Sequence, residues 1–301
     1  MLDCLIVGAG PAGLTAAIYL ARFHLKVAVI DAGQSRALWI PETHNHAGFP
    51  LGISGAALLA RMRQQAELYN ALIWNEQVSD IRLKDKAFKA TYGDAQATAT
   101  TVLRATGVVN RRPKMDNDLH EKALDAGRLR YCPICDGYEV TDQNVAVIGT
   151  GDRGLTEAEF LRSYTKKVTL ISPDESHELD KDQREKASQL GIKLVEGAAA
   201  IDRITDTGIV VATGNGELAF ETVYPALGSH VNNTLAKMLG AKCGEDDGIS
   251  VDAEQRTSVA GLYAAGDVVI GLDQISHAMG EGGVAAVTIR NDMAQRRALL
   301  R

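Results

Sequence analysis

The feature that most constrains the fold is a glycine-rich turn near the N-terminus, set between a short apolar strand and a helix. Residues 3–31 read DCLIVGAGPAGLTAAIYLARFHLKVAVID, in which an apolar run at 5–7 leads into the pattern G-x-G-x-x-G. Residues 14–23 follow with helical spacing, and a second apolar run at 27–30 ends in Asp31. This order of strand, turn, helix and strand predicts a Rossmann-type βαβ unit in an α/β protein.

Each part of this pattern suits a bound dinucleotide. Gly8 permits a tight turn, Gly10 lets the backbone approach a pyrophosphate, and Gly13 lets the helix pack closely on the strand. The amide groups at the start of the helix attract an anion. A carboxylate 23 residues after the first glycine can accept a hydrogen bond from a ribose hydroxyl. The predicted contact residues are Gly8, Gly10, Pro11, Ala12, Gly13 and Asp31.

The same pattern returns 141 residues later, so the chain contains two related Rossmann-like units. Residues 144–172 read NVAVIGTGDRGLTEAEFLRSYTKKVTLIS and keep all three glycines. Ser172 takes the place of Asp31, and no arginine for a 2′-phosphate follows it in Ser172-Pro173-Asp174-Glu175. The sequence leaves open whether the second unit binds a nucleotide or keeps only the packing of the fold. Arg153, inside the second turn, could either contact a phosphate or obstruct the groove.

A segment near the C-terminus completes the first unit. Residues 258–267 read SVAGLYAAGD, a short apolar strand that ends in Gly266-Asp267. It resembles the second FAD fingerprint of flavoproteins with two dinucleotide domains, in which the aspartate binds a ribityl hydroxyl. Residues 274–287 then have helical spacing and small residues, which suits a helix whose N-terminal amides approach the flavin ring.

The reactive groups concentrate in Cys132-Pro133-Ile134-Cys135-Asp136. Two cysteines spaced in this way at a helix start can close a small disulfide ring, and the helix N-terminus stabilises a thiolate. Asp136 is placed to exchange a proton with the dithiol. A zinc site needs four ligands, whereas the other two cysteines, Cys4 and Cys243, are distant in sequence, so we expect no metal. A redox pair is therefore favoured over zinc binding or a purely structural disulfide.

Composition excludes several classes of function. The 301 residues are 46% hydrophobic and 23% charged, as in soluble globular proteins. The net charge of -6 and the lack of a basic run argue against nucleic acid as a partner. No segment approaches the roughly 20 apolar residues of a membrane helix, and the apolar N-terminus lacks the positive region of a signal peptide. We therefore expect a cytoplasmic protein with no membrane partner.

The motifs occur in the order found in the low-molecular-weight thioredoxin reductases, which the chain resembles nearly end to end. They are GAGPAG, a flavin loop at Asn45-His46-Ala47-Gly48-Phe49, GISG at 52–55, ATG at 105–107, CPICDG at 132–137 and GLYAAGD at 261–267. The resemblance implies an FAD-dependent pyridine nucleotide-disulfide oxidoreductase. The further cofactor contacts that it implies are Asn45, Ala105, Thr106, Gly107, Gly266, Asp267, Gln274 and Ile275.

The resemblance also implies a domain plan of two Rossmann-like domains of the three-layer ββα type, the second inserted in the first. Residues 1–113 and 233–301 would form the FAD-binding domain, and residues 114–232 a central NAD(P)H-binding-like domain that carries the redox pair. Lys114 and Val231–Asn233 would be the connecting strands, and the protein would be a homodimer.

The family also suggests roles for single residues. Cys135 would face the flavin, and Cys132 would attack the substrate disulfide. His277 replaces the small residue that is usual beside the flavin, and it either relays protons or only completes the pocket wall.

This plan implies electron transfer between FAD and the disulfide of a thioredoxin-like protein or small molecule. Two alternatives stay open: a dithiol oxidase that uses oxygen, and a ferredoxin-linked reductase independent of pyridine nucleotides. The intact C-x-x-C-Asp argues against a redox sensor without turnover. The family's NADPH users carry His-Arg-Arg where this chain has Ser172-Pro173-Asp174, so we predict that NADPH is a poor reductant. The sequence does not distinguish NADPH, NADH, reduced ferredoxin and a dithiol as the electron donor.

Overall fold

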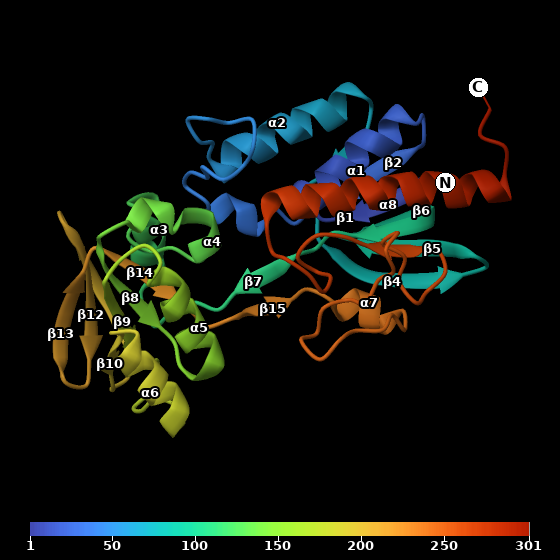
Figure 1. Cartoon of the computed structure of the whole chain (residues 1–301). Coiled ribbons are helices and arrows are strands. Elements are labelled where there is room, and N and C mark those ends of the chain that lie inside the picture. The colour runs from blue at the N-terminus through green and yellow to red at the C-terminus, as the bar shows by residue number, and fades with distance from the viewer. Residues whose placement is uncertain (301) are drawn as a thin grey trace. The chain divides into compact units, whose positions relative to one another are not determined.

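The computed structural model describes residues 1–300, which divide into two compact units, each shown in Figure 1. Unit 1 consists of Met1–Glu42, His46–Val109 and the C-terminal part from Val231, and unit 2 of Thr43–Asn45 and Asn110–His230. The chain crosses between them through β7 (Val108–Asn110) and β15 (Ser229–Val231), which pair with each other.

The prediction of a connecting strand at Lys114 is wrong. Lys114 forms an isolated parallel bridge with Ala200, on β11 (Ala200–Thr205) of unit 2. The crossing strand lies earlier because Pro113 has no amide hydrogen with which to extend the β7 pairing.

Unit 1 contains a seven-stranded sheet in the order β3-β2-β1-β6-β5-β4, with β16 also pairing with β6. Five strands run parallel, while β4 and β5 form an antiparallel extension. The strands are β1 (Leu2–Val7), β2 (Val27–Ile30), β3 (Leu72–Trp74), β4 (Val78–Lys84), β5 (Ala87–Tyr92), β6 (Ala95–Arg104) and β16 (Leu262–Ala264). The predicted βαβ unit is present, although its helix α1 (Pro11–Arg22) begins earlier than Leu14 because proline suits the first turn of a helix.

Successive apolar side chains along the strands point to opposite faces of this sheet, so a hydrophobic core forms on each face. Cys4 and Ile6 of β1 pack with α1, α2 (Gly55–Leu68) and α8 (Ile275–Arg296), whereas Leu5 and Val7 point to the opposite core. That second core includes Phe88 of β5 and residues around α7 (Thr234–Met238). Helices α1, α2 and α8 therefore cover one face of the sheet, and α7 with the loops after it packs on the other, as the period of two requires.

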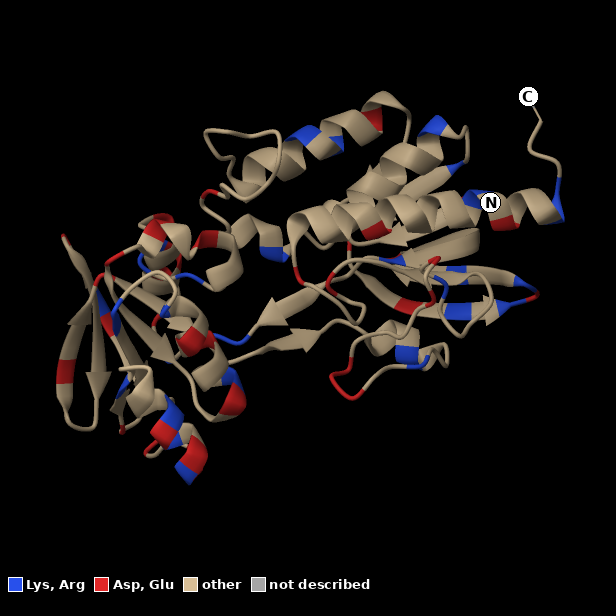
Figure 2. Ribbon diagram, viewed as in Figure 1, with Lys and Arg blue, Asp and Glu red and all other residues tan. Residues whose placement is uncertain are grey.

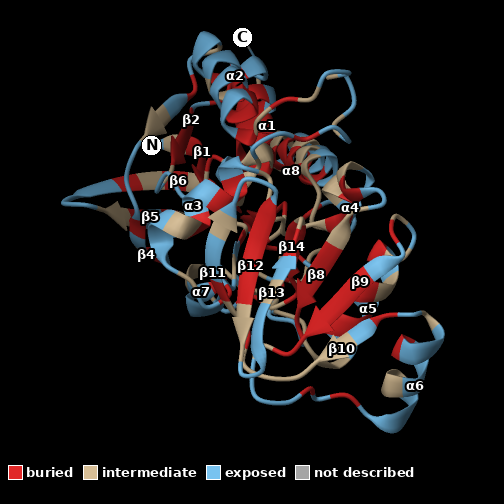
Figure 3. Ribbon diagram, turned by 90° about the vertical axis from the view of Figure 1, so that its left-hand side faces the viewer, coloured by how far each residue is buried: buried red, intermediate tan, exposed pale blue. Residues whose placement is uncertain are grey.

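Unit 2 repeats the design on a smaller scale. Its parallel sheet has the order β10-β9-β8-β14, and a separate antiparallel sheet has the order β11-β12-β13. The buried strands β8 and β9 are red in Figure 3. The parallel strands are β8 (Asn144–Ile148), β9 (Lys167–Ile171), β10 (Lys193–Val195) and β14 (Thr222–Pro225), and the antiparallel sheet adds β12 (Gly208–Thr213) and β13 (Gly216–Phe220). The helices are α3 (Asn117–Asp125), α4 (Pro133–Asp136), α5 (Gly151–Leu161) and α6 (Lys181–Gln189).

The predicted α/β fold with two Rossmann-like units is confirmed. In residues 1–300, no helix combines the length and the hydropathy that crossing a membrane requires.

Candidate active site and cofactor site

The two cysteines of the C-x-x-C motif are joined in unit 2 as a disulfide, with their Cα atoms 5.2 Å apart. Cys132 is the N-cap of α4, and Pro133 occupies the first turn of that helix. The backbone amide of Cys135 donates a hydrogen bond to Sγ of Cys132 at 3.2 Å. A donor that points at sulfur stabilises a thiolate more than a thiol. This geometry suits Cys132 as the nucleophile once the disulfide is reduced.

Asp136 is held by two side chains that the sequence analysis did not single out. Tyr224 Oη donates to Asp136 Oδ1 at 2.8 Å, and Arg130 Nη1 donates to Asp136 Oδ2 at 2.9 Å. Burial raises the pKa of Asp136, while Arg130 and Tyr224 oppose that rise. The carboxyl group therefore has a fixed direction beside Cys135. Arg130 stands two residues before the motif, but Tyr224 comes from β14, and no sequence signal connects it to the cysteines.

A second carboxyl group lies close to this network. Glu157, on α5, has an Oε1 atom that is buried and has no hydrogen-bond partner within residues 1–300. Burial raises the pKa of Glu157 to about 7, and the charge of Asp136 adds to the rise while Arg153 opposes it. Glu157 can thus hold a proton near neutral pH, and it too was missed from the sequence.

The residue before the motif is anchored to α3. Tyr131 Oη lies 2.9 Å from Nε2 of His120, a buried side chain. Burial lowers the pKa of His120 to about 4, so the ring is neutral at pH 7 and the contact is a neutral hydrogen bond.

The first glycine-rich turn of unit 1 has the close packing that a pyrophosphate site needs. Gly8 has a φ of 105°, and a Cβ atom there would collide with the carbonyl oxygen of Ala105. A Cβ atom on Gly13 would collide with the carbonyl oxygen of Gly8. Helix α1 starts after Gly10, which has no side chain to cap the first amides. The backbone amide groups at this turn are therefore available to bind an anion.

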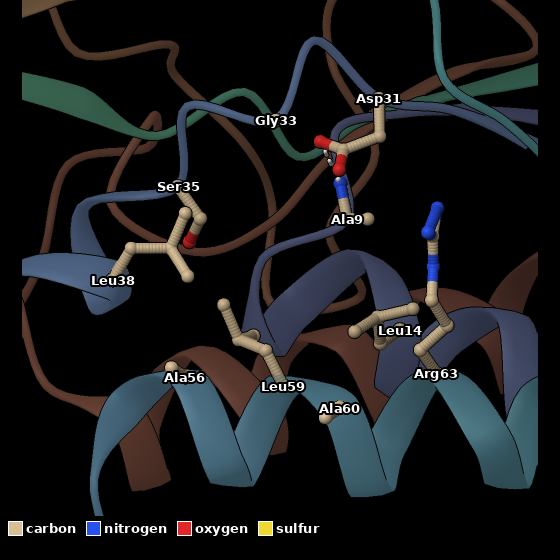
Figure 4. A pocket seen from close by; sticks show the side chains of 10 residues that line it. All are labelled: Ala9, Leu14, Asp31, Gly33, Ser35, Leu38, Ala56, Leu59, Ala60 and Arg63. Atoms are coloured by element: carbon tan, nitrogen blue, oxygen red, sulfur yellow. Dashed lines mark hydrogen bonds between the residues drawn. The ribbon is translucent and has the colours of Figure 1, made fainter.

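A cavity of about 180 Å³ continues from this turn (Figure 4). Asp31 lies at its rim, where one carboxylate oxygen accepts a hydrogen bond from the amide of Ala9 at 3.2 Å, and Arg63 contributes a cation. Small and apolar side chains form most of the wall, which suits an adenosine. The lining residues are Ala9, Leu14, Asp31, Gly33, Ser35, Leu38, Ala56, Leu59, Ala60 and Arg63.

The second predicted cofactor segment also belongs to unit 1. Gly266 has a φ of 78°, and its amide donates to Glu281 Oε2 at 2.7 Å. Gln274 is the N-cap of α8 and Ile275 its first residue. His277 Nε2 lies 3.0 Å from Glu281 Oε1, with 42% of the His277 side chain exposed. The residues present therefore fit the two fingerprints of an FAD site.

The predicted site residues divide between the two units. The dinucleotide-site residues, the ATG segment and His277 belong to unit 1, while Cys132, Cys135 and Asp136 belong to unit 2. Thr106 Oγ1 donates to the carbonyl oxygen of Asn232 at 2.8 Å. Asn45 groups with unit 2, where its amide donates to the carbonyl oxygen of Ile134 at 3.4 Å.

The chain that follows β9 is hydrogen-bonded to the second glycine-rich turn. Ser172 is fully buried, and its hydroxyl donates to the carbonyl oxygen of Ser176 at 2.9 Å. The amide of Glu178 donates to Thr150 Oγ1 at 2.6 Å, directly before α5. Residues 172–180 therefore fold against the turn that would hold a pyrophosphate.

The arginine on the following helix, α6, is also engaged. Arg184 Nη1 contacts Glu196 Oε1 at 3.1 Å, and its other nitrogens donate to the carbonyl oxygens of Leu179 and His177. Acidic and basic residues are interspersed along α6 (Figure 2). Helix α6 therefore carries mixed charge and not a run of basic residues for a 2′-phosphate.

The comparisons with known proteins agree with this chemistry. Residues 2–282 match the family described as pyridine nucleotide-disulphide oxidoreductase. The chain is 34% identical to a thioredoxin reductase of Treponema pallidum over 295 residues, which cover 94% of each chain. It is 32% identical to a thioredoxin reductase of Mycolicibacterium smegmatis over 283 residues, covering 89% of this chain and 88% of the relative.

A solved structure gives the same result for the fold. The thioredoxin reductase of Streptococcus pyogenes superposes with a TM-score of 0.88 at 28% identity, covering 98% of this chain and 99% of the other. The chain therefore belongs to the pyridine nucleotide-disulphide oxidoreductase family and is an FAD-binding, flavin-dependent disulfide oxidoreductase.

Proposed function

We propose that the protein passes electrons between FAD in unit 1 and the disulfide of a thioredoxin-like protein or small molecule, through Cys132 and Cys135. In this proposal residues 1–113 and 233–301 form the FAD domain, and residues 114–232 carry the redox pair. The observation that carries the proposal is the Cys132–Cys135 disulfide at the start of α4, with Asp136 fixed beside it. The thioredoxin reductases among the relatives support the choice of partner.

The chemistry of the protein side chains follows from this geometry. Bound FAD, once reduced by the electron donor, would supply the two electrons that open the disulfide. The thiolate of Cys132 attacks one sulfur of the substrate disulfide and releases the other substrate sulfur as a thiolate. Cys135 then attacks Cys132 Sγ, restores the intrachain disulfide and releases the second substrate thiolate. Asp136, one residue from Cys135, is the group that we assign to transfer protons to the leaving sulfurs.

We further propose that NADPH is a poor electron donor. The segment 172–180 is hydrogen-bonded to the second turn, and Arg184, a candidate partner for a 2′-phosphate, is bound to Glu196. Each charge-assisted hydrogen bond to a phosphate contributes roughly 1.5–3 kcal/mol. The absence of two such contacts costs roughly 3–6 kcal/mol, or about two to four decades of affinity.

Ser172, which stands where the first unit has the ribose-binding acid Asp31, also favours a second candidate, a dithiol oxidase that transfers electrons from a dithiol substrate to oxygen. Such an enzyme, or a ferredoxin-linked reductase, does not require the second nucleotide site. Anaerobic flavin bleaching distinguishes these donors when NADPH, NADH, reduced ferredoxin and a dithiol are added in turn. Fast bleaching by micromolar NADPH would exclude the proposal about the donor.

Trapping the substrate tests the roles of the cysteines. In the Cys135→Ser variant, Cys132 can attack an oxidised thioredoxin but cannot be released, so we expect a stable mixed disulfide detectable by mass spectrometry. The Cys132→Ser variant is the matched control and should trap little. Preferential trapping by Cys132→Ser would reverse the two roles, and trapping by neither variant would argue against thioredoxin as the substrate.

A further inference from the structure

Arg36 connects two segments of unit 1 that both face the predicted FAD site. It begins the short 3₁₀ helix η1 (Arg36–Trp39), between Ser35 and Leu38, which line the cavity of Figure 4. A Cβ atom placed on Gly10 would lie 3.4 Å from Ser35 Oγ, so Ser35 lies beside the phosphate-binding turn. From this position Arg36 Nη2 reaches Asp267 Oδ2 at 2.6 Å. One side chain thereby joins the segment after the first fingerprint to the second fingerprint.

The surroundings of Asp267 are unusually acidic. Arg36 Nη1 also contacts Asp273 Oδ2 at 3.1 Å. Glu281 accepts the amide hydrogen of Gly266, directly before Asp267, and pairs with His277. Burial and the charge of Asp267 raise the pKa values of Asp273 and Glu281, while Arg36 lowers that of Asp273 and His277 lowers both.

A pyrophosphate would bring further negative charge to this region. Like charges several ångströms apart inside a protein repel one another strongly enough to weaken the binding of an anion. Arg36 offsets two of the carboxylates and fixes the direction of Asp267, the residue assigned to the ribityl chain. We propose that Arg36 is a positioning residue for FAD, which orients Asp267 and neutralises the acidic segment so that the pyrophosphate can be held. This inference rests on the proposed FAD site.

A merely structural ion pair and this electrostatic role predict different results. If Arg36 and Asp273 only brace the fold, removing either partner should weaken FAD binding alike. If Arg36 instead neutralises the carboxylates beside the FAD site, Arg36→Gln weakens FAD binding. Asp273→Asn then removes a negative charge and leaves FAD binding unchanged or makes it tighter. The two substitutions break the same contact at 3.1 Å, so the sign of their effects separates the two roles.

The experiment measures the dissociation constant of FAD with apoprotein, by the quenching of flavin fluorescence. We expect Arg36→Gln to raise the Kd at least tenfold, Arg36→Lys to raise it less, and Asp273→Asn not to raise it. Arg82→Gln is the control, because Arg82 lies on β4 with 80% of its side chain exposed. Circular dichroism checks that each variant is folded, and the Arg36→Lys result stands if Arg36→Gln does not fold.

Two results would overturn the inference. One is a Kd for Arg36→Gln, or for Arg36→Lys in its place, that matches the wild-type protein. The other is equal weakening by the Arg36 and Asp273 substitutions. Failure of the wild-type apoprotein to bind FAD would instead overturn the proposed function itself.

Discussion

Glu157 lies near the redox network with a carboxyl group that the protein keeps from ionising easily. One oxygen of the group is buried without a hydrogen-bond partner in the described chain, and the charge of Asp136 adds to the effect of burial. The folded protein holds the Glu157 proton up to about pH 7, whereas an ordinary glutamate loses it near pH 4.5. Folding is therefore favoured by this group at low pH, and that contribution is lost as the pH rises through 7.

Substitution of Glu157 by Gln should remove this dependence on pH. We expect the free energy of unfolding of the wild-type protein, relative to Glu157→Gln, to fall by about 2–3 kcal/mol between pH 5 and pH 8. Urea unfolding at both pH values measures the difference. Glu159→Gln, on the same helix with the Glu159 side chain 40% exposed, is the control. Parallel curves for wild type and Glu157→Gln would show that Glu157 ionises normally.

At the residue scale, the sequence predicts the groups that act through their own motif. Gly8, Gly13 and Cys132 have roles that depend on local backbone geometry, so their spacing is informative. Cys4 is buried, and burial raises the pKa of its thiol to about 12, which makes it unreactive. Tyr224 on β14 holds Asp136, and the charge of Asp136 helps to raise the pKa of Glu157 on α5. Tertiary packing alone brings these three residues together.

At the scale of elements, α1 depends on its close approach to β1. A Cβ atom at Gly13 would meet the carbonyl oxygen of Gly8, and the Ala105 methyl group at 3.2 Å, so the helix would have to move. We expect Gly13→Ala to destabilise the protein by at least about 2 kcal/mol and to release FAD. Thermal unfolding and the flavin absorbance of the purified variant test both effects.

The same substitution on α8 is the matched control. A Cβ atom at Gly280 meets no heavy atom within 4 Å apart from its own helix. We expect Gly280→Ala to be neutral or to stabilise the protein by up to about 1 kcal/mol, because alanine favours helix. Equal losses in both variants would contradict the packing argument.

Element order is easier to predict from this sequence than element ends or loop contacts. The 141-residue repeat predicts both βαβ units, and the structure contains them. The sequence shows that Ser172 is not an acid, but the hydrogen bond from Glu178 to Thr150 depends on how a loop without regular periodicity folds. Helix α8 runs to Arg296 rather than ending near residue 287, because residues 288–296 contain no glycine or proline to end the helix.

At the scale of the whole molecule, the chain enters and leaves unit 2 through the paired strands β7 and β15. An insertion of this kind keeps the unit 1 sheet continuous, because β16 returns after unit 2 to pair with β6. The internal repeat predicts two units, whereas the exact crossing depends on three-residue strands that carry no distinctive pattern. With FAD bound as proposed, each unit would hold one two-electron centre: FAD in unit 1 and the disulfide in unit 2.

An anaerobic titration of the purified protein with dithionite, followed by flavin absorbance and by thiol counting, tests this account most directly. The wild-type protein should be yellow, with about one FAD per chain, and should accept four electrons: two for the flavin and two for the disulfide. The Cys132→Ser and Cys135→Ser variants should each accept two. A wild-type titration that ends after two electrons, or a folded protein that cannot be reconstituted with FAD, would contradict electron transfer through the Cys132–Cys135 pair.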